Sequence, residues 1–165
     1  MNLVAILCIG GSVSASSFFY QPPSPCRMLA DRMHVAVDIR AHSGKTIADM
    51  MCATAAKDQT DCVTDAEIAA APLVASVDGF YWFTGYVDGC AAAHAASEHL
   101  FAVRGNRPMI LATVPGAFGC QAINAVLRDR CKDACILIEP PAFTGLHPDE
   151  AYLKRLVNEF YPARR

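Results

Sequence analysis

The sequence has no basic stripe that would bind a polyanion and no apolar run long enough to cross a membrane. Its 165 residues contain 14 Lys and Arg against 16 Asp and Glu, a formal net charge of -2. The basic residues are scattered along the chain rather than clustered, as a nucleic-acid backbone would require. No apolar stretch approaches the ~20 residues of a membrane span. We therefore expect neither a nucleic-acid nor a membrane partner.

The eight cysteines include no C-x-x-C pair and lack the regular spacing of a small disulfide-stabilised domain. This pattern favours buried free thiols in a reducing cytoplasm and no metal site. Cys131 and Cys135 are close in sequence, but Cys135 is expected to open a strand, which would point the two thiols in different directions. The apolar opening lacks the basic residues that precede the core of a secretory signal, since the first one is Arg27. We interpret it as a buried strand and expect a cytoplasmic protein.

Hydrophobic periodicity predicts strands that alternate with helices over residues 1–165, as one domain. The predicted strands are Leu3–Ile9, His34–Ile39, Gly79–Thr84, Arg107–Thr113 and Cys135–Glu139, and the predicted helices are Pro25–Met33, Asp65–Ala75, Cys90–Val103, one around Ala122–Leu127 and one starting at Pro148–Glu150. Thr64 and Glu67 have the spacing of a capping box at the start of one helix. Such alternation requires right-handed crossovers and a mainly parallel sheet covered on both faces. The predicted fold is an α/β three-layer sandwich with strand order 2-1-3-4-5, which is the flavodoxin-like arrangement.

Ligands of such sheets bind beyond the carboxyl ends of the strands, where the strand order reverses. The loops at this edge after the first, third and fourth predicted strands are Gly10–Ser17, Thr84–Gly89 and Val114–Gly119, and all three are rich in small residues. Glycines let backbone amides approach a ligand, and serine hydroxyls can donate to phosphate oxygens. These loops are the predicted site.

The three loops resemble those of the NAD(P)H-dependent FMN reductases. Ile9–Ser17 is similar to their phosphate loop, G-S-x-R-x-x-S, Thr84–Gly89 looks like their flavin loop, T-P-x-Y-x-G, and Pro115–Gly119 resembles their third flavin loop. The resemblance implies bound FMN, NAD(P)H as hydride donor, a small-molecule acceptor such as a quinone or flavin, and a homodimer. The implied cofactor-binding residues are Gly11, Ser12, Ser14, Ser16 and Ser17 at the phosphate, Thr84, Gly85, Tyr86, Val87 and Gly89 at the ring, and Pro115, Gly116, Ala117, Phe118 and Gly119 at its other edge. No catalytic residue is assigned, because the flavin itself carries the chemistry.

Other functions fit parts of the same sequence. Without access for nicotinamide, the flavin site would make an electron carrier. The segment 82–111 also looks like nucleoside deoxyribosyltransferase-like proteins, in which Asp88 or Glu98 would attack an anomeric carbon near His94 and His99. Ser14 stands at the arginine position of the phosphate loop, and Gly85 and Val87 depart from the flavin-loop pattern. These three departures favour a third possibility, a module that has lost FMN and serves in binding or assembly.

Overall fold

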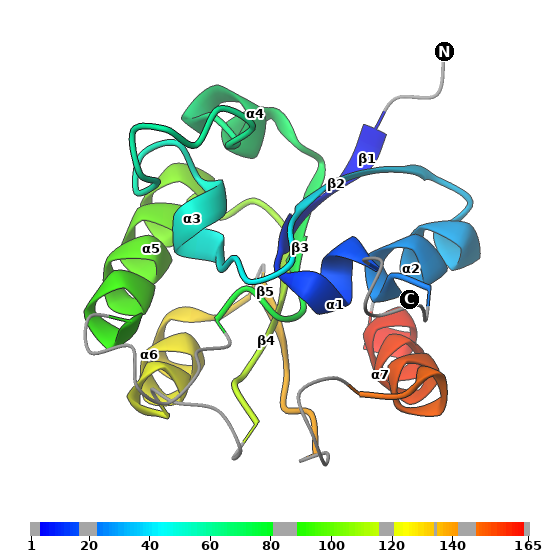
Figure 1. Ribbon diagram of the computed structural model, residues 1–165. Helices are drawn as coiled ribbons and strands as arrows, with labels where there is room; N and C mark the ends of the chain where they lie inside the picture. The colour runs from blue at the N-terminus through cyan, green and yellow to red at the C-terminus, as the bar shows by residue number, and fades with distance from the viewer. Residues whose placement is uncertain are drawn as a thin grey trace.

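The computed structural model describes residues 4–16, 23–80, 89–115, 121–133, 135–141 and 148–163. They form a three-layer α/β sandwich around a five-stranded sheet of order β2-β1-β3-β4-β5, in which every paired strand is parallel to its neighbour (Figure 1). The strands are β1 (Val4–Gly10), β2 (Ala36–Ala41), β3 (Leu73–Ser76), β4 (Met109–Ala112) and β5 (Cys135–Ile138). The helices are α1 (Ser12–Ala15), α2 (Pro25–Met33), α3 (Ile47–Met50), α4 (Asp65–Ala70), α5 (Gly89–Arg104), α6 (Ala122–Arg130) and α7 (Glu150–Ala163). The predicted fold class and strand order are confirmed.

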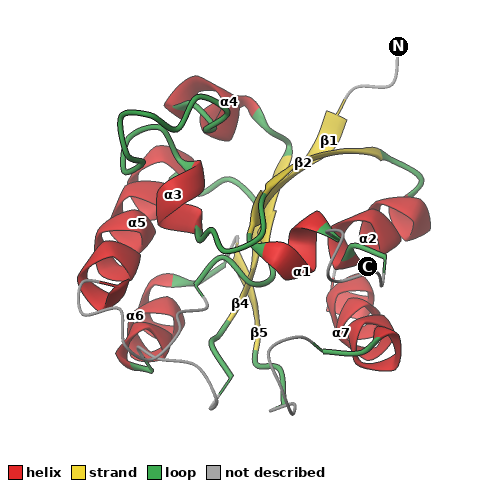
Figure 2. Cartoon of the chain, in the orientation of Figure 1, coloured by secondary structure: helices red, strands yellow, loops and turns green. Residues whose placement is uncertain are grey.

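Side chains that alternate along the strands build two cores, one on each face of the sheet. Leu7 and Ile9 of β1 belong to the core covered by α3, α4, α5 and α6. Ile6 and Cys8 of the same strand belong to the other core, covered by α1, α2 and α7. Figure 2 shows these two groups of helices on opposite sides of the strands. Strands buried on both faces explain why they read as continuous apolar runs in the sequence.

The predicted third strand is wrong. The strand is Leu73–Ser76, fully buried along its length, and the preceding helix ends at Ala70 rather than at Ala75. Pro72 explains the difference, because the residue before a proline avoids the helical region and proline itself cannot continue the helix. Phe80, assigned to the strand, is buried in the core beyond it. The rest of that assignment, 81–84, lies outside the described residues.

The expectation of free buried thiols is also wrong. Disulfides join Cys8 to Cys26, Cys52 to Cys62 and Cys131 to Cys135, Cys90 is disulfide-bonded as well, and no described cysteine is free. The second core brings the buried Cys8 of β1 against Cys26 in the first turn of α2. The amide of Cys135 donates to the carbonyl of Lys132, so the chain turns back between Cys131 and Cys135 instead of separating them.

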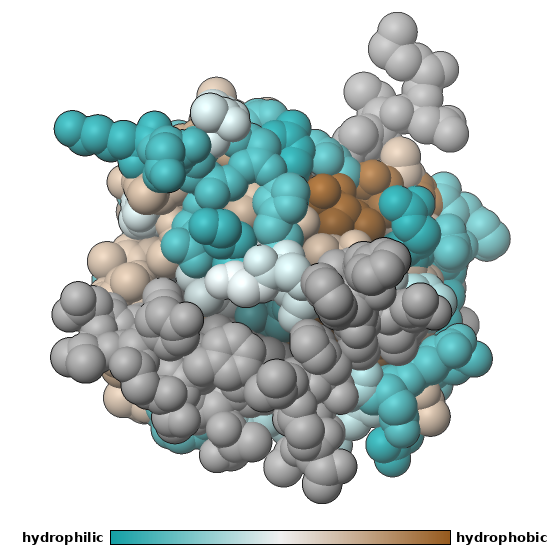
Figure 3. All heavy atoms as spheres, in the orientation of Figure 1, coloured by the Kyte–Doolittle hydropathy of each residue, from teal (hydrophilic) through white to brown (hydrophobic). Residues whose placement is uncertain are grey.

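Figure 3 shows hydrophilic residues where Figure 1 shows α2 and α4, paler apolar colours over α5, and a brown apolar area where Figure 1 shows β1 and β2. All six residues of the edge strand β2 are half-buried. Within the described ranges, no helix combines the length and the apolar character that a membrane crossing requires.

Candidate functional site

The chain leaves β1 through a tight turn at the carboxyl edge of the sheet. β1 lies between β2 and β3, where the strand order reverses, so this turn opens at the position where such folds bind ligands. Ser12 is the first residue of α1, a single helical turn that ends at Ser16 in the left-handed conformation, with φ 49°. Ser12 is partly exposed, whereas Val13 and Ser14 behind it are buried. The turn therefore buries Val13 and Ser14 and leaves Ser12, Ala15 and Ser16 partly exposed.

Asp78, just beyond the carboxyl end of β3, holds this turn from beneath. Its Oδ1 accepts hydrogen bonds from the amide of Gly11 at 3.1 Å and from the hydroxyl of Ser14 at 2.7 Å. Its Oδ2 accepts from the amides of Val13 at 2.9 Å and of Ser14 at 3.4 Å. A single buried carboxylate thus satisfies the first backbone donors of α1, which otherwise have no partner at a helix start.

Burial raises the pKa of Asp78, and the hydrogen bonds from Ser14, Gly11 and Val13 oppose that rise. The fit around the carboxylate is close. A Cβ on Gly10 would lie 2.3 Å from its Oδ1, and a Cβ on Gly11 would lie 2.5 Å from the carbonyl oxygen of Lys45. Glycine stands at both positions because there is no room for a side chain.

The loop after β4 forms another wall of the same edge. Asn124 of α6 accepts from the amide of Val114 at 2.7 Å and donates to its carbonyl at 2.9 Å. Gln121 donates to the carbonyl of Pro115 at 2.9 Å. Since both polar groups of the Asn124 amide are engaged, this residue fixes the loop rather than offering a free group to a ligand.

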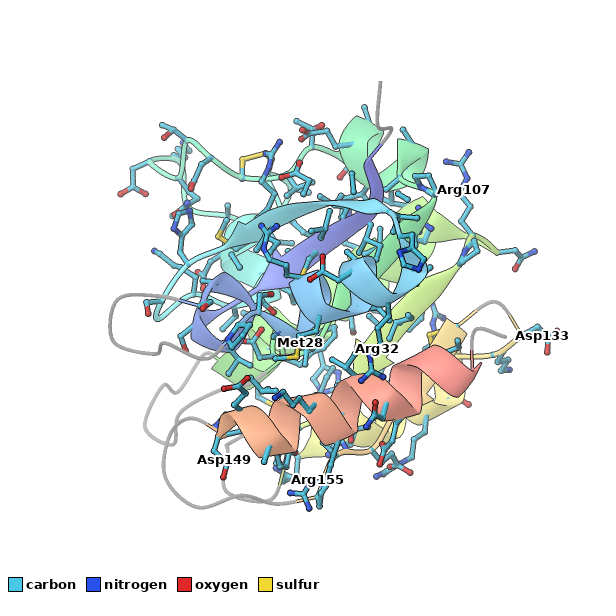
Figure 4. All side chains as sticks on the ribbon, turned by 90° about the vertical axis from the view of Figure 1, so that its right-hand side faces the viewer. Met28, Arg32, Arg107, Asp133, Asp149 and Arg155 are labelled. Carbon is cyan, nitrogen blue, oxygen red and sulfur yellow. A yellow bond between two sulfur atoms is a disulfide. The ribbon has the colours of Figure 1, made fainter. Side chains whose placement is uncertain are left out.

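The loop after β5 leads into α7. The hydroxyl of Tyr152 donates to the carbonyl of Pro141 at 2.6 Å, and the Asp149 carboxylate accepts from the amide of Tyr152 at 2.8 Å. The beginning and the end of this loop are therefore tied together. In Figure 4 the beginning of α7, which directly follows the labelled Asp149, and the blue helix α1 both lie toward the left of the view.

The structure brings four of the predicted site residues together in the turn after β1: Gly11, Ser12, Ser14 and Ser16. Two others lie on separate elements, Gly89 at the first position of α5 and Pro115 in the loop after β4. The remaining nine lie outside the described residues: Ser17, Thr84, Gly85, Tyr86, Val87, Gly116, Ala117, Phe118 and Gly119.

Sequence reasoning missed Asp78 because it placed this residue before the third strand instead of after it. The available signal was Pro72 followed by the short apolar run Leu73–Ser76, which places Asp78 at the carboxyl edge of the sheet. The consequence is chemical. The amides of Gly11, Val13 and Ser14, and the Ser14 hydroxyl, already bind a carboxylate of the chain itself, and this weighs against a phosphate at this turn.

The carboxylates and histidines of the deoxyribosyltransferase alternative do not assemble into a site among the described residues. Glu98 pairs with Arg130 at 3.1 Å on the exposed side of α5, and His99 contacts Asp65 at 2.7 Å. Asp88 lies outside the described residues. That alternative gains no specific support.

Comparison with known proteins gives structural neighbours only. No protein-family model matches the chain, and no curated protein does. A family two carbohydrate esterase from Cellvibrio japonicus matches all of this chain with a TM-score of 0.66 and 11% identity. An active-site mutant of a family two carbohydrate esterase from Clostridium thermocellum matches 95% of it with a TM-score of 0.63 and 13% identity. A protein from Lactobacillus plantarum matches 99% of it, and 97% of that protein is covered, with a TM-score of 0.62 and 13% identity.

These likenesses establish the fold, and the chain spans only 61% and 63% of the two esterases' lengths. They overturn the FMN reductase resemblance and the oxidoreductase function drawn from it, since both named neighbours are hydrolases and nothing found supports an FMN reductase. The wrong inference came from small-residue loops that any tight turn at this edge would need. FMN and NAD(P)H binding and the homodimer stay untested predictions. What the chain is similar to is a set of α/β proteins that includes carbohydrate esterases.

Proposed function

We propose that this chain is a serine hydrolase that removes acyl groups from carbohydrate esters, with Ser12 as its nucleophile. The observation that carries the proposal is the placement of Ser12: a partly exposed hydroxyl-bearing residue just beyond the carboxyl end of β1, the strand between β2 and β3, at the start of a turn held by Asp78. A fold shared with two carbohydrate esterases supports this class of substrate. A serine needs a neighbouring base to become a nucleophile, so the next question is which group takes its proton.

Position in the chain favours His147 as that base. It directly precedes the buried Pro148 and follows β5, and its own placement lies outside the described residues. The turn carrying Ser12 leads into the α1, α2 and α7 layer, and α7 begins three residues after His147. The other histidines are less suited. His34 caps the carboxyl end of α2, His42 contacts Asp61, and His94 and His99 lie on α5 in the opposite layer.

The proposed reaction has two halves. The Ser12 oxygen attacks the ester carbonyl while His147 accepts the hydroxyl proton, and the sugar alcohol leaves with that proton. Water then hydrolyses the acyl-serine by the same steps and releases the carboxylic acid. The amides of Gly11, Val13 and Ser14 cannot stabilise the oxyanion, because Asp78 already occupies them. The oxyanion donors must therefore come from other groups at the edge.

The test is hydrolysis of 4-nitrophenyl acetate and of acetylated xylo-oligosaccharides by the purified chain. We expect Ser12→Ala to lower kcat by at least about a thousandfold, while Ser16→Ala, in the same turn, stays close to wild type. We expect His147→Gln to lower kcat as Ser12→Ala does, and His42→Gln to leave kcat close to the wild-type value. A fluorophosphonate should add to Ser12 in the wild type, as read by peptide mass. Full activity in Ser12→Ala would overturn the assignment.

The disulfides bear on where the protein works. Disulfides persist in oxidising compartments and are rare in a reducing cytoplasm. We therefore place the chain in an oxidising compartment rather than in the expected cytoplasm. Alkylation of the denatured protein, isolated without reductant, should label none of the seven described cysteines before reduction and all of them afterwards. Free thiols in that sample would contradict this inference and favour a reducing compartment such as the cytoplasm.

A further inference from the structure

We propose that Asp78 is the positioning residue of the Ser12 nucleophile, acting as a helix cap supplied from a distant part of the chain. The activity part of this inference rests on the proposed function. The structural part, that the Asp78 carboxylate fixes the turn from Gly11 to Ser14, stands without it.

Helix α1 lacks the means to hold itself in place. It has four residues, far below the length at which an isolated helix is stable in water. Its N-cap is Gly11, which has no side chain to accept the first amides, and no acidic residue lies in its first turn. Asp78, 64 to 67 residues further along the chain, supplies that missing acceptor.

The four hydrogen bonds bracket Ser12. One carboxylate oxygen binds the amide before it, at Gly11, and the other binds the amide after it, at Val13. The Ser14 hydroxyl, one position further on, closes the arrangement at 2.7 Å. With the residues on both sides bound to the same carboxylate, the backbone of Ser12 and the direction of its Cα–Cβ bond are fixed, which limits the positions that its hydroxyl can take and so favours a reacting nucleophile.

Asp78 is itself held by its surroundings. The carbonyl of the next residue, Gly79, accepts from the amide of Ile47 at 2.8 Å. A Cβ on Gly79 would lie 2.2 Å from the Ser76 hydroxyl oxygen and 2.9 Å from Cβ of Ile47, so the backbone beside Asp78 is closely packed and leaves no space for a side chain at Gly79. Asp78 is 4% exposed. Among the described residues no Lys or Arg forms an ion pair with it, and its oxygens are bound by the amides and the hydroxyl of the turn.

The experiment removes the carboxylate and offers a small one in its place. Asp78→Ala leaves the amides of Gly11, Val13 and Ser14 without an acceptor, and we expect Tm to fall by about 10 °C. Sodium formate should restore part of the lost Tm and of the lost kcat, whereas sodium chloride at the same ionic strength should not. Asp49→Ala is the matched control, because Asp49 also caps a short helix, through Thr46, but in a half-buried site. Formate should not restore its Tm.

Asp78→Asn keeps the protein testable if Asp78→Ala does not fold. Its carbonyl can still accept from Val13, and its amide group can donate to the Ser14 oxygen, so only the Gly11 amide loses its partner. We expect kcat to fall at least about tenfold with KM nearly unchanged, since positioning acts on the reacting atom rather than on substrate binding. Unchanged kcat in this variant would overturn the inference.

The outcomes separate the two proposals. If formate restores the Tm of Asp78→Ala while even the wild type hydrolyses no ester, the fixing of the turn by Asp78 holds and the esterase proposal fails. If the wild type is active and formate restores neither Tm nor kcat in the variant, the positioning role fails and the esterase proposal stands.

Discussion

Replacing Gly10 with alanine tests the close packing beneath the candidate nucleophile. The new Cβ would lie 2.3 Å from Asp78 Oδ1 and 2.7 Å from the Ser14 hydroxyl oxygen, both fully or nearly buried. Relief of this overlap requires the carboxylate to move, which breaks its bonds to Gly11 and Ser14. Overpacking costs about 1–3 kcal/mol and each lost buried bond about 1 kcal/mol more. Alanine offsets about 0.4–1 kcal/mol of this loss, because it has fewer conformations than glycine in the unfolded chain. We therefore expect Gly10→Ala to lower the free energy of unfolding by about 3 kcal/mol.

The measurement is urea denaturation followed by far-ultraviolet circular dichroism, with Gly44→Ala as the control. Gly44 has a φ of +75° and no atom within 4 Å of a built Cβ, so alanine there meets only the left-handed strain of about 1–2 kcal/mol. Ester hydrolysis should fall in Gly10→Ala and stay near wild type in Gly44→Ala. If Gly10→Ala loses no more stability than Gly44→Ala, the packing argument at Asp78 is refuted.

Arg104→Met should lower the free energy of unfolding by about 3 kcal/mol, because the buried guanidinium donates to three backbone carbonyls at 2.6–2.7 Å. Arg107 is exposed, so Arg107→Met should lower it by less than about 0.5 kcal/mol in the same urea assay. Burial raises the pKa of Tyr152 from 10.0 to about 12, so its contribution to stability is present below pH 10 and lost as pH rises toward 12. Unfolding free energies of wild type and Tyr152→Phe across this range should therefore converge, and parallel curves would contradict the reasoning. The hydrogen bond from the Thr64 amide lowers the pKa of Glu67 below 4.5. The stability that ionised Glu67 contributes is therefore present above pH 4.5 and is lost as the pH falls below it. Thr64→Ala should lower the free energy of unfolding by about 1 kcal/mol at neutral pH. If Thr64→Ala lowers it by the same amount in a Glu67→Gln background, the two residues do not act as a coupled capping box.

The elements whose start and stop signals are local were predictable from the sequence. Helix α2 begins at Pro25 and ends at Met33 as predicted, because proline suits the first helical turn and the apolar spacing continues to that end. The capping box of Thr64 and Glu67 forms as its spacing indicated. The strand order could be predicted because five strands that alternate with helices and are joined by right-handed crossovers leave few orders, of which 2-1-3-4-5 is favoured.

Features that depend on contacts between distant segments were not predictable in the same way. The pairing of Cys8 with Cys26 requires knowing that α2 returns over β1, which spacing does not state. The third strand was misplaced because the aromatic run beyond it has the stronger strand propensity, while Leu73–Ser76 is short. Tertiary burial decided between them: these four residues pair with β1 on one side and β4 on the other.

One misplaced strand also accounts for the wrong function. With the strand at Gly79–Thr84, Asp78 falls at the amino edge of the sheet, and the turn after β1 keeps a set of free amides that fits a phosphate. With the strand at Leu73–Ser76, Asp78 lies at the carboxyl edge, and its carboxylate accepts hydrogen bonds from those amides. The same glycine and serine residues then serve to pack and fix a turn around Asp78 rather than to bind an external anion. The proposed nucleophilic role of Ser12 depends on this reassignment, so the position of Asp78 after β3 decides how the loop after β1 is interpreted.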